Sequence, residues 1–140
     1  MFDLAQRVAL LTGANGGIGR AITRQFTEFG ARVVMADINV DGAMEFASAL
    51  DGAQSSIAVT KLNAGSADDV DQAIRFALDR FDRLDFLVTA AAIYDDQPFE
   101  TMTDDQWRYT LTTNLDSVYL CMPARDSCYG GRLGNCESRL

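Results

Sequence analysis

Glycines cluster directly after the first apolar run of the chain, in the segment Thr12-Gly13-Ala14-Asn15-Gly16-Gly17-Ile18-Gly19. Glycine tolerates the backbone angles of a tight turn and lets a phosphate approach bare N–H groups at a helix N-terminus. Asp37 closes the next apolar run at nearly the spacing, about 20 residues, expected for a carboxylate that binds ribose hydroxyls. The pattern predicts a phosphate-binding turn and a ribose-binding acid, while a purely structural turn is the alternative.

The composition of the chain argues for a globular protein and against nucleic acid or a membrane as a partner. With 140 residues, 48% of them hydrophobic, it predicts one globular domain, residues 1–140, with a buried core. A net charge of −8 argues against nucleic acid as a partner, because affinity for a phosphate backbone depends on Lys and Arg. No apolar run reaches the roughly 18–20 residues that cross a bilayer, so we expect no membrane partner and a cytoplasmic location.

Three cysteines, Cys121, Cys128 and Cys136, lie near the C-terminal end of the chain. Their odd number argues against a disulfide framework, and their spacing fits no common zinc pattern. The chain has no histidine, so Ser-His-Asp and Cys-His catalysis are excluded, and we expect no metal site. We interpret the cysteines as incidental, with a reactive thiol as the alternative.

Two helices are expected around the glycine segment and the acid. The first ends at Gly30 and should pack on the sheet through one apolar face: Ile18, Ile22, Phe26 and Phe29. Asn39 is a candidate N-cap for the second helix, which ends before a turn at Asp51-Gly52. The expected apolar stripe of this second helix is Val40, Ala43, Met44, Ala47 and Leu50.

Residues 56–62 predict a third strand, and the next helix has the clearest pattern in the chain. Ser66 lies three residues before Asp69, which is typical of a helix start. Apolar residues then follow at helical spacing: Val70, Ala73, Ile74, Ala77, Leu78 and Phe81. We therefore expect this helix to bury a continuous face.

Residues 84–89 predict a fourth strand, followed by a long helix. Thr103 and Gln106 form a second capping box, and Pro123 marks the expected helix end. One face of this helix should be apolar: Trp107, Leu111, Leu115, Val118 and Met122. The acidic pairs 68–69 and 104–105 fall in first helical turns, where the helix dipole favours negative charge.

This alternation of strands and helices predicts an α/β fold, a doubly wound parallel sheet with helices on both faces. The expected strand order is 3-2-1-4, which leaves the fourth strand as an unpaired apolar edge. Ligands in such sheets bind at the carboxyl ends of the strands, where the glycine segment, Asp37 and Ala90-Ala91-Ala92 lie. Residues 94–99 follow that edge and are interpreted as a solvated loop, with a substrate mouth as the alternative.

Residues 4–122 resemble the N-terminal part of the short-chain dehydrogenase/reductase family, and residues 123–140 diverge from it. The resemblance rests on Thr12-Gly13-x-x-x-Gly17-Ile18-Gly19 and implies a Rossmann-type fold, truncated after about the fourth or fifth strand. It implies NAD as cofactor, because Asp37 would repel a 2′-phosphate and Gly16 replaces a basic residue frequent in NADP-preferring members. The implied cofactor-binding residues are Gly13, Asn15, Gly17, Ile18, Gly19, Asp37, Ile38, Asn63, Ala64, Ala90, Ala91 and Ala92.

The chain departs from the family pattern at several positions. Asn63-Ala64 stands where members carry Asp-Val beside the adenine ring, and residues 89–92 keep only the third residue of Asn-Asn-Ala-Gly. Asn114 resembles the family's helix asparagine, which holds a proton-relay water, and Ser138 matches the catalytic serine. The family's Tyr-x-x-x-Lys pair is absent, since the only lysine is Lys61.

The resemblance implies an NAD-dependent oxidoreductase that interconverts a small alcohol and a ketone by hydride transfer, inactive as this chain without the Tyr and Lys. A non-catalytic nucleotide-binding or oligomer-interaction module is the alternative, with a homo-oligomer formed through the helix after Thr103. A third possibility is a chain too incomplete to fold stably. The pattern break near residue 123 is what a truncated or frameshifted product would show.

Overall fold

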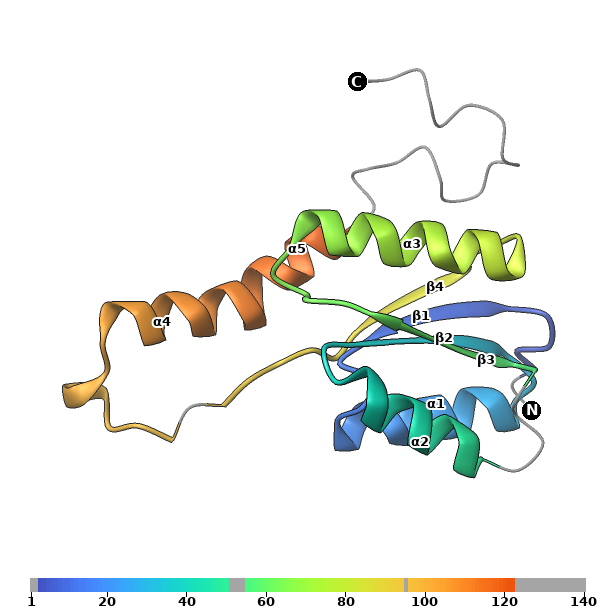
Figure 1. Cartoon of the computed structure of the whole chain (residues 1–140), viewed down its shortest axis with the longest axis horizontal. Coiled ribbons are helices and arrows are strands. Elements are labelled where there is room, and N and C mark those ends of the chain that lie inside the picture. Colours follow the sequence, from blue (N-terminus) through green and yellow to red (C-terminus); the bar gives the residue numbers. More distant parts are fainter. Residues whose placement is uncertain (1–2, 51–54, 95, 123–140) are drawn as a thin grey trace, which may run out of the picture.

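The computed structural model describes residues 3–50, 55–94 and 96–122 and contains one parallel sheet (Figure 1). Its strands are β1 (Val8–Thr12), β2 (Arg32–Asp37), β3 (Ile57–Lys61) and β4 (Phe86–Thr89), in the order β3-β2-β1-β4. The predicted α/β fold and strand order are confirmed, with β4 at one edge. Within the described residues, no helix has the length and hydrophobicity needed to cross a membrane.

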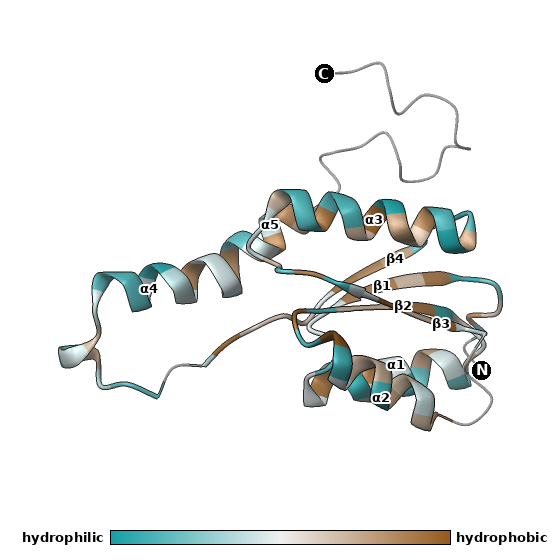
Figure 2. Cartoon of the chain, in the orientation of Figure 1, coloured by the Kyte–Doolittle hydropathy of each residue, from teal (hydrophilic) through white to brown (hydrophobic). Residues whose placement is uncertain are grey.

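Helices cover both faces of the sheet. Figure 1 shows α1 (Gly17–Glu28) and α2 (Val40–Ala49) on one side, with α3 (Ala67–Phe81) on the other. Successive side chains of a strand point to opposite faces, so Leu10 joins the core under α3 while Leu11 joins the core under α1 and α2. Figure 2 shows hydrophobic colouring along the central parts of β1, β2 and β4, whereas hydrophilic and hydrophobic residues alternate along the helices.

Three predicted helix starts are confirmed. The Asn39 side chain accepts a hydrogen bond from the Gly42 N–H (3.1 Å), and the Ser66 hydroxyl accepts one from the Asp69 N–H (3.3 Å). Thr103 and Gln106 form a complete capping box at the start of α4 (Asp104–Leu111). The predicted stripe of α3 is also confirmed, since all its members are buried or packed against the core.

The predicted faces of α1 and α2 were partly wrong. Ile18 is 73% exposed, and Phe29 and Met44 are exposed as well. In α2, Phe46 packs against the core instead of Met44, and the same helical period accommodates either residue. The predicted turn at Asp51-Gly52 lies outside the described residues.

The long C-terminal helix is not α-helical throughout, and its predicted apolar face was partly wrong, since Leu111 and Val118 are partly buried. A π-helical turn, η2 (Thr112–Asp116), separates α4 from α5 (Ser117–Cys121). A π-turn bonds residue i to i+5, so it shifts the helical phase. Trp107, Leu115 and Met122 are exposed, while Leu120 and Cys121 pack against the core under α3. Pro123, the predicted helix stop, lies outside the described residues.

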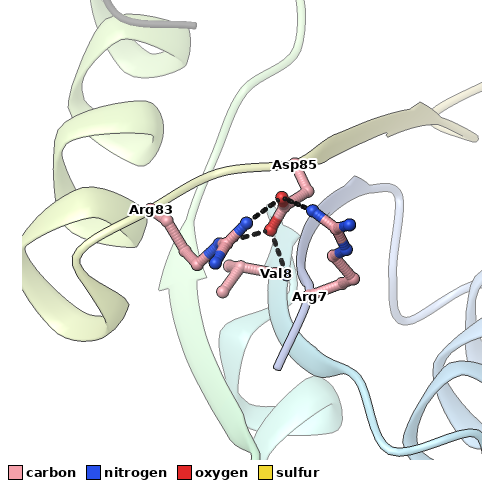
Figure 3. Close-up of polar contacts among 4 residues, drawn as sticks. All are labelled: Arg7, Val8, Arg83 and Asp85. Atoms are coloured by element: carbon pink, nitrogen blue, oxygen red, sulfur yellow. Dashed lines mark hydrogen bonds and ion pairs between the residues drawn. The ribbon is translucent and has the colours of Figure 1, made fainter. Parts of the chain in front are cut away.

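Asp85 connects the N-terminal ends of the neighbouring strands β1 and β4 (Figure 3). The glycine segment lies at the opposite, C-terminal ends of the strands. The Asp85 carboxylate accepts hydrogen bonds from Arg83 (2.6 and 2.8 Å), Arg7 (3.0 Å) and the Val8 N–H (2.9 Å). Burial opposes ionisation, but the hydrogen bonds from Arg83, Val8 and Arg7 outweigh it and lower the pKa of Asp85 to about 2. The ionised carboxylate of Asp85 therefore stabilises the folded chain more than the protonated carboxyl does.

This contact predicts a pH-dependent loss of stability at Asp85. Because its pKa is lower in the folded chain than the ordinary value of 3.8, its contribution is complete above pH 4 and declines as the pH falls towards 2. We expect Asp85→Asn to lower the free energy of unfolding by about 1 kcal/mol at neutral pH, since both arginines are half exposed. Urea unfolding of both proteins should show this difference closing at acid pH; an unchanged difference would contradict it.

Candidate functional site

The site lies at the carboxyl edge of the sheet, where the chain turns from β1 into α1. The Ala14 N–H donates to the carbonyl of Ala36 at the end of β2 (3.3 Å), and the Gly16 N–H closes the turn on the Gly13 carbonyl (3.1 Å). These bonds hold the glycine segment between β1 and β2. The glycine segment and Asp37 are therefore neighbours, as the sequence pattern predicted.

Two of the glycines are required by the fold itself. Gly13 has a φ of +64°, and a Cβ there would lie 2.6 Å from both the N and the Cα of Ala91. A Cβ on Gly19 would collide with the Gly13 carbonyl oxygen and lie 2.6 Å from Ala14 Cα. Both positions need glycine for backbone reasons, whatever ligand the turn binds.

Gly17 differs from these two glycines, because a Cβ built on it meets no atom of the described residues within 4 Å. Its φ also lies outside the left-handed region. Nothing in the described part of the chain thus demands glycine here. The surface at Gly17 is open, so backbone and no side chain would face an incoming group, and we call this open backbone surface the cradle.

The N-terminus of α1 is open. It has no side-chain cap and no acidic residue in its first turn, whereas α2, α3 and α4 each have both. Among the described residues, the N–H groups of Gly17, Ile18 and Gly19 have no hydrogen-bond acceptor. Unpaired N–H groups and the positive end of the helix dipole favour an anion, so this cradle suits a phosphate or pyrophosphate.

Asp37 is buried beside the turn. One carboxylate oxygen accepts a hydrogen bond from the Asn15 N–H (2.8 Å), and the other accepts one from the Asn39 N–H (2.9 Å). The carboxylate therefore has a structural role, joining the glycine segment to the start of α2. A carboxylate offers about four lone-pair positions, so acceptor capacity remains for ribose hydroxyls. Ile38, the next residue, is exposed.

Asn63 and Ala64 follow the end of β3. The Asn63 side-chain oxygen accepts a hydrogen bond from the Gly65 N–H (3.1 Å), and its backbone N–H donates to Asp69 (2.9 Å). The Ala64 side chain is buried in the core under α3. The structure thus shows a turn role for Asn63, and the adenine contact stays a prediction.

Ala90, Ala91 and Ala92 continue from β4 past the glycine segment. The Thr12 hydroxyl accepts hydrogen bonds from the N–H groups of Ala90 and Ala91 (both 3.3 Å), which fixes this segment against the end of β1. The role of Thr12 was not predicted, although a hydroxyl at the end of an apolar strand was a signal for it. Ala92 is exposed at the rim of the site.

Asn114 lies in η2 and holds the next residue of this segment. Its side-chain oxygen accepts a hydrogen bond from the Ile93 N–H, and its amide donates to the Ile93 carbonyl (both 2.8 Å). The side chain thus pairs with a backbone as a neighbouring strand would. The contact brings Asn114 beside the segment that follows β4, a position and a partner that were not predicted, and the proton-relay role of Asn114 stays a prediction.

We expect Asn114→Ala to free the loop after β4. Loss of both hydrogen bonds should raise the hydrogen-exchange rate of the Ile93 amide by roughly tenfold or more, because each bond contributes about 1 kcal/mol. Exchange at Leu10, in the centre of the sheet, is the internal control. An unchanged exchange rate at Ile93 would contradict the inference that the Asn114 side chain holds the Ile93 backbone.

The remaining predicted groups do not complete a catalytic set in the described residues. Ser138 lies outside them, as do Cys128 and Cys136, while Lys61 is exposed at the end of β3. Burial raises the pKa of the Cys121 thiol, which disfavours a reactive thiolate. In the parts of the chain that the structure covers, no group of three or more His, Cys, Asp or Glu side chains could hold a metal ion.

Comparisons with known proteins identify the family. The family model described as short chain dehydrogenase matches residues 7–126. An uncharacterized oxidoreductase of Mycobacterium bovis is 37% identical over 83% of this chain and 47% of its own length. A 3-oxoacyl-[acyl-carrier-protein] reductase of Synechocystis is 36% identical over 89% of this chain and 51% of its own.

Solved structures agree with this result. A short-chain dehydrogenase/reductase from Brucella melitensis, described as glucose/ribitol dehydrogenase, is 43% identical with a TM-score of 0.82, over 86% of this chain and 50% of that one. A 3-ketoacyl-(acyl-carrier-protein) reductase from the same organism, complexed with NADH, is 29% identical with a TM-score of 0.77, over 85% of this chain and 48% of that one.

The chain belongs to the short-chain dehydrogenase family of oxidoreductases, which use NAD or NADP. It spans about half the length of the curated relatives it matches. The described residues form a Rossmann-like α/β sheet with the strand order 3-2-1-4.

Proposed function

We propose that this chain binds NAD through the open N-terminus of α1 and Asp37. The observation that carries the proposal is the bare cradle at Gly17, where three backbone N–H groups face no partner among the described residues. Gly17, Ile18 and Gly19 would hold the pyrophosphate. Asp37 and Ile38 would line the adenosine ribose, and Asn63 and Ala64 would adjoin the adenine.

Selectivity for NAD over NADP is attributed to Asp37. Its carboxylate can accept hydrogen bonds from free ribose hydroxyls, whereas a 2′-phosphate would place like charges together at a buried acid. Gly16 offers no cation to offset this repulsion. We therefore expect NADP to bind at least tenfold more weakly than NAD, equivalent to about 1.4 kcal/mol.

We further propose that the reaction for which this cofactor site is built is the interconversion of a small secondary alcohol and a ketone. NAD would accept the hydride from the alcohol, and reduced NAD would donate it to the ketone. Ala90, Ala91 and Ala92 would border the nicotinamide side, with Asn114 fixing the loop beyond them through Ile93. Without a Tyr-x-x-x-Lys pair the chain lacks an activated proton donor, which costs on the order of 10²–10⁴-fold in rate. The chain alone should therefore show negligible turnover.

Calorimetric titration of the purified chain with NAD, NADP and ADP-ribose tests the binding proposal, and absorbance of reduced nicotinamide with secondary alcohols tests the turnover. We expect NAD and ADP-ribose to bind, NADP to bind more weakly, and no alcohol-dependent reduction. Absence of NAD and ADP-ribose binding would overturn the binding proposal. Sustained reduction would overturn the expected inactivity.

One observation favours an interaction module as the second candidate. Helix α4 has no buried residue and extends away from the sheet (Figure 1), with Trp107 and Tyr109 exposed on it. A short helix gains most of its stability from packing, so self-association through α4 would supply what it lacks. Concentration-dependent light scattering that Trp107→Glu abolishes would support a homo-oligomer, whereas a monomer at every concentration would exclude it.

A further inference from the structure

Four residues in and beside the glycine segment contact one another next to the proposed cofactor site. They are Arg20 in the first turn of α1, Asn15 in the turn before it, and Gly42 and Phe46 in α2. We propose that Arg20 is a positioning residue that sets the ribose-binding carboxylate, Asp37, by fixing Asn15. This inference rests on the proposed NAD binding and names a residue that controls it without touching the ligand.

The contact between Arg20 and Asn15 is a fork. Arg20 Nε donates to the Asn15 carbonyl oxygen (2.9 Å) and to the side-chain oxygen Oδ1 (3.2 Å), and Nη2 donates to Oδ1 (2.7 Å). Both oxygens of Asn15 are thus held by one guanidinium. Lysine cannot reproduce this planar, multi-point contact, although it retains the charge.

Asn15 links Arg20 to Asp37 through its backbone N–H group. Its backbone N–H donates to Asp37 Oδ2 at 2.8 Å, while the Asn39 N–H holds Oδ1 at 2.9 Å. These two bonds define the orientation of the carboxylate and so the direction of its remaining lone pairs. A displaced Asn15 would release one of the two, and the carboxylate would rotate away from the ribose hydroxyls.

Helix α2 contacts both Arg20 and Asn15, through Phe46 and Gly42 respectively. The Arg20 guanidinium lies over the Phe46 ring, 5.2 Å from its centroid, within the range of a cation–π contact. A Cβ on Gly42 would lie 2.7 Å from Asn15 Nδ2, so glycine at this helical position leaves room for the Asn15 side chain. Arg24 also lies over Phe46, at 6.0 Å, but makes no hydrogen bond to the turn among the described residues.

The test is a double-mutant cycle with ADP-ribose as the titrated ligand and the full chain as the protein. We expect Arg20→Lys to weaken binding by about tenfold in the wild-type background and by less than about twofold in Asp37→Asn, because the lysine acts only through the carboxylate. Arg24→Lys is the matched control and should leave binding within about twofold. Urea unfolding of each variant separates loss of binding from loss of fold.

Gly42→Ala provides an independent route to the same displacement. The added methyl would lie 2.7 Å from Asn15 Nδ2, so we expect it to displace Asn15 and weaken ADP-ribose binding. It would also lie 2.9 Å from Nδ2 of Asn39, the N-cap of α2, so urea unfolding of this variant must accompany the titration, although alanine favours the helix interior more than glycine does. Equal effects of Arg20→Lys in both backgrounds, or none in either, would overturn the proposal for Arg20. Failure of the unmodified chain to bind ADP-ribose would instead overturn the proposed function, and this inference with it.

Discussion

Replacement of Gly13 by alanine is expected to lower the free energy of unfolding by about 3 kcal/mol or more. A left-handed conformation costs a residue with a Cβ about 1–2 kcal/mol, and overpacking typically adds 1–3 kcal/mol. Both apply here, because φ is +64° and the new Cβ would lie 2.6 Å from the N and Cα of Ala91. The Thr12 hydrogen bonds to Ala90 and Ala91 leave that backbone little room to move. Urea unfolding measures the effect.

Gly30→Ala is the matched control for this prediction. Gly30 has a φ of +85°, but a Cβ there would come no closer than 3.3 Å to the Ala5 backbone. It therefore reports the cost of the left-handed conformation with much less overlap, and we expect a loss of about 1–2 kcal/mol. Equal losses at Gly13 and Gly30 would show that the contact with Ala91 contributes nothing.

Asp37→Ala is expected to lower NAD affinity by about 10- to 100-fold, because a hydrogen bond to a charged group contributes about 1.5–3 kcal/mol. It should weaken NADP much less, since the same change removes the charge that opposes a 2′-phosphate. The ratio of the two dissociation constants is therefore the decisive quantity. Calorimetric titration with both dinucleotides measures it.

A purely structural role for Asp37 predicts a different result. The variant leaves the N–H groups of Asn15 and Asn39 without this acceptor, so some stability will be lost in any case. If that were its only effect, NAD and NADP would weaken by the same factor and their ratio would not change. Asp41→Ala, in the first turn of α2, controls for removal of a nearby acidic charge.

The sheet could be predicted from the sequence because each strand contains a short apolar run. Such runs are typical of parallel strands buried on both faces, and β1 is buried throughout. The helix starts could be predicted for a local reason, since Asn39 and Ser66 satisfy N–H groups only three residues ahead. The strand order is the one expected of a Rossmann-type sheet, which the family resemblance implied.

The long helix could not be predicted correctly, because its phase depends on a contact distant in sequence. Asn114 pairs with Ile93 across the end of β4, in the same π-turn that changes which side chains face the core. Periodicity assumes one uniform helix and therefore placed Leu115 and Met122 on a single apolar face with Trp107. In the structure, Leu115 and Met122 are exposed, and Leu120 and Cys121 pack against the core.

The glycine segment was recognised, but the separate roles of its residues were not. Sequence alone cannot distinguish Gly13 and Gly19, which the backbone requires, from Gly17, which the described chain does not require. Similarly, Asp37 was predicted as a ribose ligand, while its bonds to Asn15 and Asn39 emerged only from the fold. The structure thus separates residues that form the site from those expected to contact the cofactor.

The most direct test of the cofactor site is parallel titration of the unmodified chain and Gly17→Ala with ADP-ribose, together with urea unfolding of both. A methyl at Gly17 meets nothing in the described chain, so stability should be unchanged or higher by up to about 1 kcal/mol. The same methyl would occupy the proposed pyrophosphate cradle, and we expect ADP-ribose binding to fall at least tenfold. Equal affinity of the two proteins would contradict the account.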